Sequence, residues 1–166
     1  MKPASSFVLG LLTGVVVAVA GVVIAMPRLM LKERVSPLSL DETITTITQR
    51  VAAAHWTVSS VMPLDQSVRK HGGAELPPIR LVNICQAGHA SRLLVKGETR
   101  KVSVMMPCTI AVYEGDDGKT RVATLNAGLL GRMFGGEVSA VMAGPVASEQ
   151  ASFVDFDGTR QSASLQ

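Results

Sequence analysis

Hydrophobic and polar positions divide the chain into one long apolar run near the N-terminus and a longer segment of mixed composition. Residues 7–26 hold no charged side chain, and a helix of about 20 residues spans about 30 Å, the hydrocarbon thickness of a bilayer. The run continues past Ala18-Val19-Ala20, where a signal peptidase would cut, whereas the apolar cores of signal peptides are about 7–15 residues long. The pattern therefore predicts an uncleaved transmembrane anchor over residues 7–26, after a tail of residues 1–6, with a cleaved signal peptide as the alternative.

Three small residues, Gly10, Gly14 and Ala18, recur at every fourth position within this run. On a helix they lie on one face, and such a ridge allows two membrane helices to approach closely. Glycine is also common in membrane helices that do not pair. The ridge is a candidate surface for the pairing of two anchors, and an unpaired anchor is the alternative.

Beyond the anchor, the pattern alternates between strand and helix periods. Residues 27–36 indicate a short linker that runs into a first strand. Ser39 and Glu42 have the spacing of a capping box, and the apolar residues behind them recur with a helical period, which predicts a helix over 40–54. The remaining pattern predicts strands over 55–62, 79–85, 109–114 and 120–125, short helices over 65–70 and 88–96, and a last helix that begins near Ala127 and weakens or ends at Gly144-Pro145.

The order of these elements indicates an α+β domain. Gly115-Asp116-Asp117-Gly118 separates two apolar runs and is a hairpin signal. Strands that are adjacent in sequence, with a helix at each end, predict a single domain over 37–150 with an antiparallel sheet and helices packed on one face. The polar and small residues 151–166 predict a disordered tail.

Composition and charge limit the classes of function. Apolar residues make up 47% of the 166 residues and charged residues 17%, but most of the apolar excess lies in the anchor, and the remainder has the composition of a globular domain. The net charge is +3, with scattered Lys and Arg and only 4% aromatic residues. A nucleic-acid-binding domain usually has a clustered basic face. We therefore expect the lipid bilayer, and no nucleic acid, as a partner.

The sequence holds no recognisable catalytic or nucleotide-binding motif. It has no G-x-S-x-G, no P-loop and no dinucleotide fingerprint. Its carboxylates fall in predicted caps, turns and polar faces rather than in a pair suited to acid–base catalysis. These features favour a non-enzymatic role.

The two cysteines are the main candidates for chemistry. Cys85 and Cys108 each lie at the end of a predicted strand, and neighbouring strand ends of an antiparallel sheet can meet. The pair is compatible with a disulfide, a redox-active dithiol, half of a metal site, or two thiols packed in the core. His89 follows Cys85 by four residues and Met106 precedes Cys108 by two. Together these four side chains form a set of soft donors that suits copper, zinc or haem iron.

Several short motifs occur together in the soluble part. The most specific is Met106-Pro107-Cys108, which leads into the strand that ends with Val112-Tyr113-Glu114. The others are Met30-Leu31-Lys32-Glu33, Ile84-Cys85, Asp117-Gly118-Lys119 and Phe134-Gly135-Gly136. On these motifs, the chain over about residues 30–150 resembles the bacterial family called domain of unknown function 302.

The resemblance implies a compact α+β domain that forms homodimers, and a bacterial source, hence a place in the cytoplasmic (inner) membrane. It implies no activity, because the function of the family is unassigned. Two positions depart from the family pattern. Gln86-Ala87 stand where the family has Asn-Pro, and His55 stands where the family has Gly before the tryptophan.

Two functions therefore stay open. The leading hypothesis is a membrane-tethered, dimeric accessory or binding module that presents its sheet or last helix to a protein of a membrane complex. The alternative is a redox, soft-metal or haem-handling domain that uses Cys85 and Cys108. The side of the membrane is also open: basic residues after the anchor favour a cytoplasmic domain, whereas Lys2 before a long apolar run is also the layout of a signal anchor that exports the domain.

Overall fold

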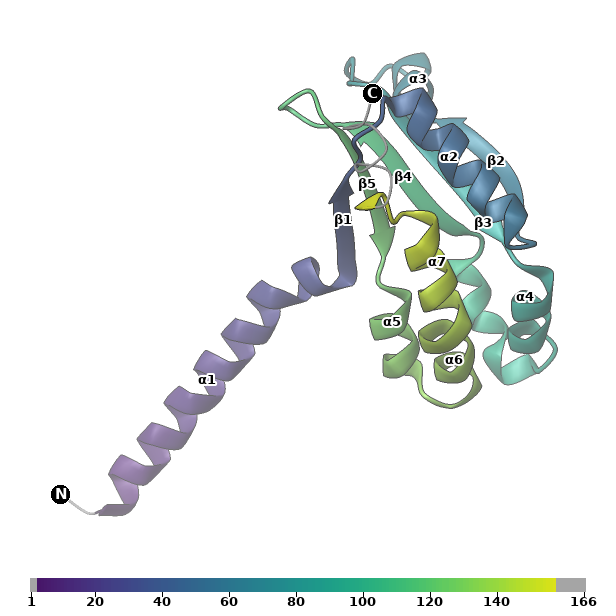
Figure 1. Cartoon of the computed structure of the whole chain (residues 1–166). Coiled ribbons are helices and arrows are strands. Elements are labelled where there is room, and N and C mark those ends of the chain that lie inside the picture. Colours follow the sequence, from purple (N-terminus) through teal and green to yellow (C-terminus); the bar gives the residue numbers. More distant parts are fainter. Residues whose placement is uncertain (1–2, 158–166) are drawn as a thin grey trace.

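The computed structural model describes the backbone of residues 3–157 and the side chains of residues 10–157. One long helix projects from a domain built on a five-stranded sheet (Figure 1). The elements follow in the order α1 (Pro3–Met30), β1 (Leu31–Val35), α2 (Leu40–Ala53), β2 (Thr57–Pro63), α3 (Leu64–Lys70), β3 (Ile79–Cys85), α4 (Ala87–Leu94), the 3₁₀ helix η1 (Gly97–Met105), β4 (Cys108–Glu114), β5 (Thr120–Leu125), α5 (Ala127–Phe134), α6 (Gly136–Val141), the π-helical turn η2 (Met142–Val146) and α7 (Ala147–Phe153).

The sheet is antiparallel throughout, with the strand order β1-β5-β4-β3-β2. Strands β2 to β5 follow one another as a meander, and β1 pairs with β5 at one edge. Helix α2 therefore crosses the sheet to connect β1 with β2 at the opposite edge. The predicted hairpin is confirmed, because β4 and β5 pair across a turn in which the Gly118 amide donates to the Gly115 carbonyl at 2.9 Å.

One face of the sheet carries the core. Val82 lies opposite Ile110, and Val112 lies opposite Val122, and all four side chains are buried. Because side chains alternate between the two faces of a strand, these four share one face. Ile47 and Val51 of α2 and the C-terminal helices complete the same cluster. The predicted fold class, an α+β domain with helices packed on one face of an antiparallel sheet, is confirmed.

Helix α2 has well-defined ends. The predicted capping box is present, since the Ser39 side chain accepts from the Glu42 amide and Glu42 accepts from the Ser39 amide. At the other end, the His55 amide donates to Ala52 and the Trp56 amide to Val51, which is the hydrogen-bond pattern of a Schellman motif. The residue after the C-cap in this motif adopts a left-handed conformation and is usually glycine. Here it is His55, with φ of 59° and an exposed side chain.

Replacement His55→Gly is expected to raise the free energy of unfolding by about 0.5–1 kcal/mol, because glycine removes the steric cost of a β-carbon at positive φ but adds entropy to the unfolded chain. Chemical denaturation of the soluble domain measures the change. His55→Ala is the matched control, since alanine keeps the β-carbon and should bring no gain. Equal stability of the glycine and alanine variants would contradict the assigned backbone strain.

Two predictions at the C-terminus were wrong. The last helix is not continuous, because Gly135 and Gly136 have positive φ and separate α5 from α6. The expected weakening at Gly144-Pro145 is confirmed, since Gly144 has non-helical φ and ψ of −93° and −111°, and α7 follows this kink. The tail is also ordered further than predicted. Phe153 and Phe156 are buried, and the guanidinium of Arg50 donates to the Phe153 and Asp155 carbonyls. The apolar side chains of this segment, which stand among small polar residues, thus extend the core to Phe156. The rest of the predicted tail, residues 158–166, lies outside the described part of the chain.

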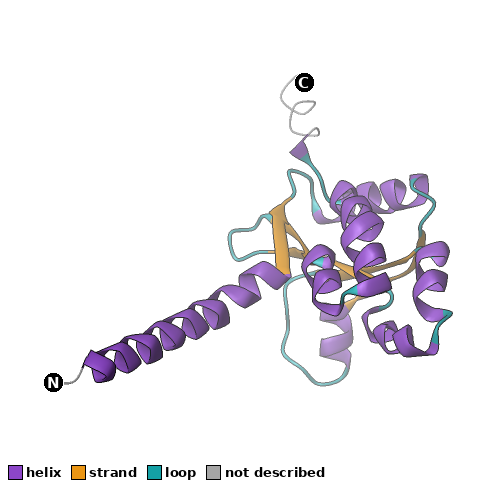
Figure 2. Cartoon of the chain, turned by 90° about the horizontal axis from the view of Figure 1, so that it is seen from below, coloured by secondary structure: helices purple, strands orange, loops and turns teal. Residues whose placement is uncertain are grey.

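Helix α1 is longer than the predicted anchor at both ends. It begins at Pro3, and it continues through Pro27 to Met30. Its segment Gly10–Met30 has a mean hydropathy of 2.3, and none of that segment is buried inside the domain. By length and composition this helix is apolar enough to cross a membrane, a test that a signal sequence also meets. Figure 2 shows it projecting away from the domain.

Candidate functional site

The sheet brings the two cysteines to neighbouring positions. Ile84 lies directly opposite Cys108 in the pairing of β3 with β4, and Cys85 is the next residue along β3. Directly opposed Cα atoms are about 4.5–5.5 Å apart and successive Cα atoms about 3.8 Å, so the Cα atoms of the two cysteines are separated by at most about 9 Å. Both are free thiols with partly buried side chains. Because side chains alternate along a strand, Cys108 shares the core face with Ile84, whereas Cys85 belongs to the other face, so a site shared by the two sulfurs must lie around the end of the strands.

All four predicted soft donors line one cavity. Cys85, Cys108, His89 and Met106 surround a space of about 20 Å³ at the end of the sheet, closed further by the Trp56 ring and by apolar residues of α4 and η2. A cavity of this size holds a single water-sized or ion-sized occupant. Its wall is almost entirely apolar apart from the donors, and the cavity is partly open to solvent, so an ion could enter it.

Local structure explains why His89 reaches this cavity. β3 ends at Cys85, and the Gln86 side chain caps α4 by accepting from the His89 amide at 2.6 Å. The helix therefore begins directly after the strand, which keeps His89 beside the strand end. On the other side, the cis Met106-Pro107 peptide bond directly precedes β4. The strand ends and the two segments next to them thus supply all four donors.

Burial changes the protonation of Cys108. Removal from water, and to a smaller extent the neighbouring Cys85, raise the pKa of the Cys108 thiol to about 11. A thiol with a raised pKa is a poor nucleophile near neutral pH, because the thiolate is the reactive form. The same thiolate is also the metal-binding form, so a metal at this site must displace the proton.

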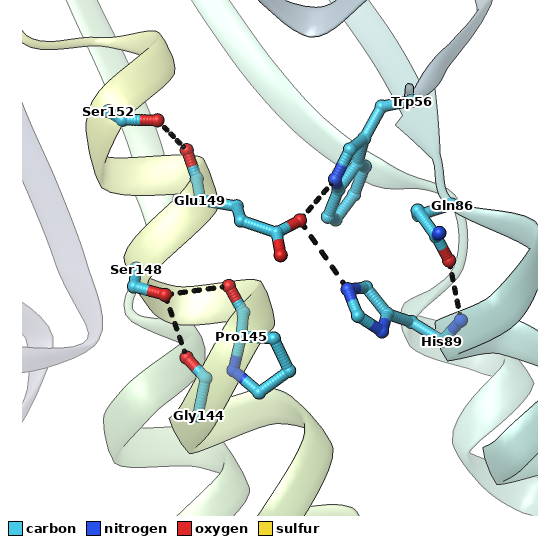
Figure 3. Close-up of polar contacts among 8 residues, drawn as sticks. All are labelled: Trp56, Gln86, His89, Gly144, Pro145, Ser148, Glu149 and Ser152. Atoms are coloured by element: carbon cyan, nitrogen blue, oxygen red, sulfur yellow. Dashed lines mark hydrogen bonds and ion pairs between the residues drawn. The ribbon is translucent and has the colours of Figure 1, made fainter. Parts of the chain in front are cut away.

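A polar cluster adjoins the cavity (Figure 3). The Trp56 indole N–H donates to Oε2 of Glu149, and Nε2 of His89 lies 3.4 Å from the same oxygen. The Trp56 and His89 rings are also in edge-to-face contact, with centroids 5.7 Å apart. Glu149 on α7 therefore connects the segment before β2 with α4 and restrains the orientation of both rings.

Sequence reasoning missed Trp56 and Glu149. Trp56 is the single tryptophan of the chain, and Glu149 is one of the carboxylates that the sequence assigned to caps, turns and polar faces. They are separated by 93 positions, so no local spacing connects them. Only the packing of α7 against α2 and the sheet brings the carboxylate to the indole.

The donor chemistry restricts which metal could fit. Among the side chains of residues 10–157, no three His, Cys, Asp or Glu groups gather closely enough to hold a metal ion together. His89 therefore does not complete a three-ligand set with the two cysteines, and its Nε2 faces Glu149. The remaining soft donors are two thiols and one thioether, from Cys85, Cys108 and Met106.

The three residues of the helix-pairing ridge lie outside the domain, on α1. Gly10 and Gly14 have no neighbouring atom within 4 Å of where a β-carbon would stand, and Ala18 is exposed. The ridge is thus uncovered in the single chain. It shares no contact with the cavity.

Comparison with known proteins extends over most of the domain. The family profile "Domain of unknown function DUF302" matches residues 32–155. A crystal structure described as an uncharacterized conserved protein DUF302 from Bacillus stearothermophilus superposes with a TM-score of 0.67 at 18% sequence identity, over 76% of this chain and 96% of that chain. No curated protein matches the chain. With the family profile matched over nearly the whole domain and the fold shared, the chain belongs to the DUF302 family.

Proposed function

We propose that this chain is a membrane-tethered, non-catalytic module that binds one Cu(I) ion through Cys85, Cys108 and Met106. The observation that carries the proposal is the convergence of these donors, from the end of β3 and the segment that enters β4, on one ion-sized apolar cavity. Thiolate and thioether ligands select Cu(I) among the metals available to proteins. His89 and Trp56 form the wall beside the ion rather than its ligand set.

The size and donor set of the cavity favour copper over the other candidates. Zinc in proteins usually has four ligands, or three and a water, and no three-ligand group of His, Cys, Asp or Glu occurs within residues 10–157. Haem needs a pocket of several hundred Å³, in the range of about 300–1,000 Å³, whereas this cavity measures about 20 Å³. A single Cu(I) ion held by sulfur ligands needs neither a third His, Cys, Asp or Glu ligand nor a pocket of that volume.

Binding is favoured over thiol redox catalysis by the state of Cys108. Reactive cysteines usually have lowered pKa values and lie in electropositive, partly exposed surroundings. Burial instead raises the pKa of Cys108 to about 11. The thiol is therefore suited to a metal that displaces its proton, and poorly suited to attack on a disulfide.

The position of the cavity suits exchange with a protein of a membrane complex. Leu31, the first residue after α1, pairs with Leu125, and Lys32 is level with Thr124 and Ile110. Cys108 lies two residues further toward the α1 end of the sheet. If α1 crosses the bilayer, as we propose, the metal cavity is at the end of the domain nearest the membrane.

The proposed module is a homodimer. On the sheet face opposite the core, Leu81, Ala111 and Ala123 remain partly exposed and form an apolar strip, which a second copy covers in the proposed dimer. The uncovered ridge of Gly10 and Gly14 on α1 offers a further contact in the membrane.

The metal proposal makes a specific prediction for pH. Because the Cys108 thiol, with a pKa of about 11, is protonated at pH 6–8, Cu(I) binding must release at least its proton. The association constant should therefore rise at least about tenfold for each pH unit between pH 6 and 8. Competition with a Cu(I) chelator, under anaerobic reducing conditions and corrected for protonation of the chelator, measures it. A pH-independent affinity would contradict thiolate ligation by Cys108.

A further inference from the structure

A second apolar surface lies at the junction of α1 with the domain. Among the described residues outside α1, Val104 and Val95 near η1 are the most exposed large apolar side chains, and Met133 and Phe134, adjacent at the end of α5, are 60% and 51% exposed. Leu29 and Leu125 are exposed at the same junction. We use the name α5 tip for Arg132, Met133, Phe134 and Gly135.

One residue fixes α5 relative to α1. The backbone amide of Asn126 donates to the Met30 carbonyl at 2.7 Å, and its side-chain amide donates to the Leu29 carbonyl at 2.8 Å. The side-chain oxygen of Asn126 also caps α5 by accepting from the Leu129 amide. The start of α5 is therefore held at the last turn of α1.

Strand direction determines where the α5 tip lies. β1 leads away from the end of α1, and β5, which is antiparallel to β1, returns to it. α5 follows β5 after one residue and extends about 12 Å over its eight residues. Figure 1 shows α5 beneath β5, nearest to α1 among the labelled helices at the lower end of the domain. α5 thus begins at the level of the last turns of α1, where Arg28 is exposed, and its tip lies about 12 Å further from that start.

The charges around the tip suit a lipid surface. Arg132 is exposed at the tip and Arg28 lies on the last turns of α1. The nearest acid in sequence, Glu137, is neutralised by an ion pair of 2.6 Å with Arg92. Methionine and phenylalanine beside arginine match the boundary between lipid headgroups and acyl chains, where apolar side chains insert and basic side chains contact anionic headgroups.

We infer that the α5 tip inserts Met133 and Phe134 into the headgroup–acyl boundary of the bilayer that α1 crosses, a second lipid contact that holds the domain at a fixed height and tilt. The inference rests on the proposed membrane tether, because it is α1 that brings the tip to the lipid. A bilayer is favoured over a second copy of the chain as the occupant, since the tip is continuous with the end of the apolar helix.

The test uses the full chain in vesicles of phosphatidylcholine with one quarter phosphatidylglycerol. A Phe134→Trp variant is compared with the parent chain, whose buried Trp56 supplies the baseline, in vesicles with and without lipids brominated near the headgroup end of the acyl chains. We expect about twofold quenching of the added emission, as for a side chain buried about 5–10 Å into the boundary. Leu76→Trp is the matched control.

The control position lies at the opposite end of the sheet. Ile79 is level, through Tyr113 and Arg121, with Val35 at the far end of β1, and Leu76 precedes it in the loop after α3. Leu76 is also partly exposed, so its replacement disturbs no core contact. Its tryptophan should not be quenched.

Flotation of the vesicles separates failure of the inference from failure of the tether. Quenching at position 134 but not at 76, in chains that float with the vesicles, supports the contact. Chains that float without selective quenching at 134 overturn the inference alone, and that result includes a tip covered by a second copy. Chains that do not float overturn the tether, and the inference falls with it.

Discussion

Cys108→Ser is expected to weaken Cu(I) binding by at least about 100-fold. The variant removes a residue that binds the metal directly, and loss of a residue that only orients a metal ligand already lowers metal affinity about 10–100-fold. Serine keeps the shape of the side chain but replaces the soft sulfur with a smaller, more polar and hard oxygen that Cu(I) disfavours. Cys85→Ser should have a similar effect, because both thiols line the same cavity. Chelator competition gives the affinities, and metal analysis of the purified chain gives the stoichiometry.

Adjacent methionines provide the matched control. Met106 lines the cavity, whereas Met105 packs against the core without lining it. Leucine conserves the volume of methionine and usually costs less than about 1.5 kcal/mol in stability. Met106→Leu should therefore weaken Cu(I) binding about tenfold, and Met105→Leu should leave it unchanged. Wild-type copper content in both serine variants would end the metal proposal.

Removal of residues 1–28 is expected to move the protein completely from the membrane fraction to the soluble fraction, with its fold intact. The segment Gly10–Met30 contributes nothing to the buried interior of the domain. Starting at Leu29 keeps the two carbonyls, of Leu29 and Met30, to which Asn126 donates. Fractionation of cells that express the full and shortened chains measures the shift, and thermal unfolding of the purified domain tests the fold.

The same shortened domain tests the dimer. Sedimentation at micromolar concentration should give twice the mass of one chain if the domain itself holds the dimer. A monomer there would remove that contact, and Gly14→Ile in the full chain would then show whether the α1 ridge pairs. Recovery of a mature soluble form that begins near Gly21 from the full chain would contradict the tether and identify the apolar run as a signal peptide.

The stability of the domain need not depend on the metal. Phe153 and Ile47 in the apolar core are at most 1% exposed, and the cavity borders one end of that core, where Ile84 and Leu93 belong to both and are themselves fully buried. The copper-free domain should therefore fold, with the cysteine pair as two protonated thiols.

Local patterns in the sequence determined most of the elements. The capping box at Ser39 and the helical period behind it predicted α2 almost to the residue, and the Asp-Gly turn predicted the β4–β5 hairpin. Residues 79–85 were predicted as a strand with the bounds that β3 has. These features depend on backbone preferences and on the burial of one face, both of which act within a few residues. The order of the C-terminal segment was not predicted, because the small polar residues around Phe153 and Phe156 are typical of a disordered tail.

Only the tertiary structure decided how the distant parts of the chain meet. The sequence supplied Cys85, His89, Met106 and Cys108 as candidates, but their common cavity follows from the way the end of β3, the start of β4 and α4 meet at one end of the sheet. Glu149 reaches Trp56 and His89 because α7 packs over the sheet, and Asn126 binds the end of α1 because β5 returns beside β1. Such contacts join residues from about 25 to nearly 100 positions apart. No period or spacing along the chain encodes them, because they arise from the order in which strands pair and from the single face on which the helices bury their apolar side chains.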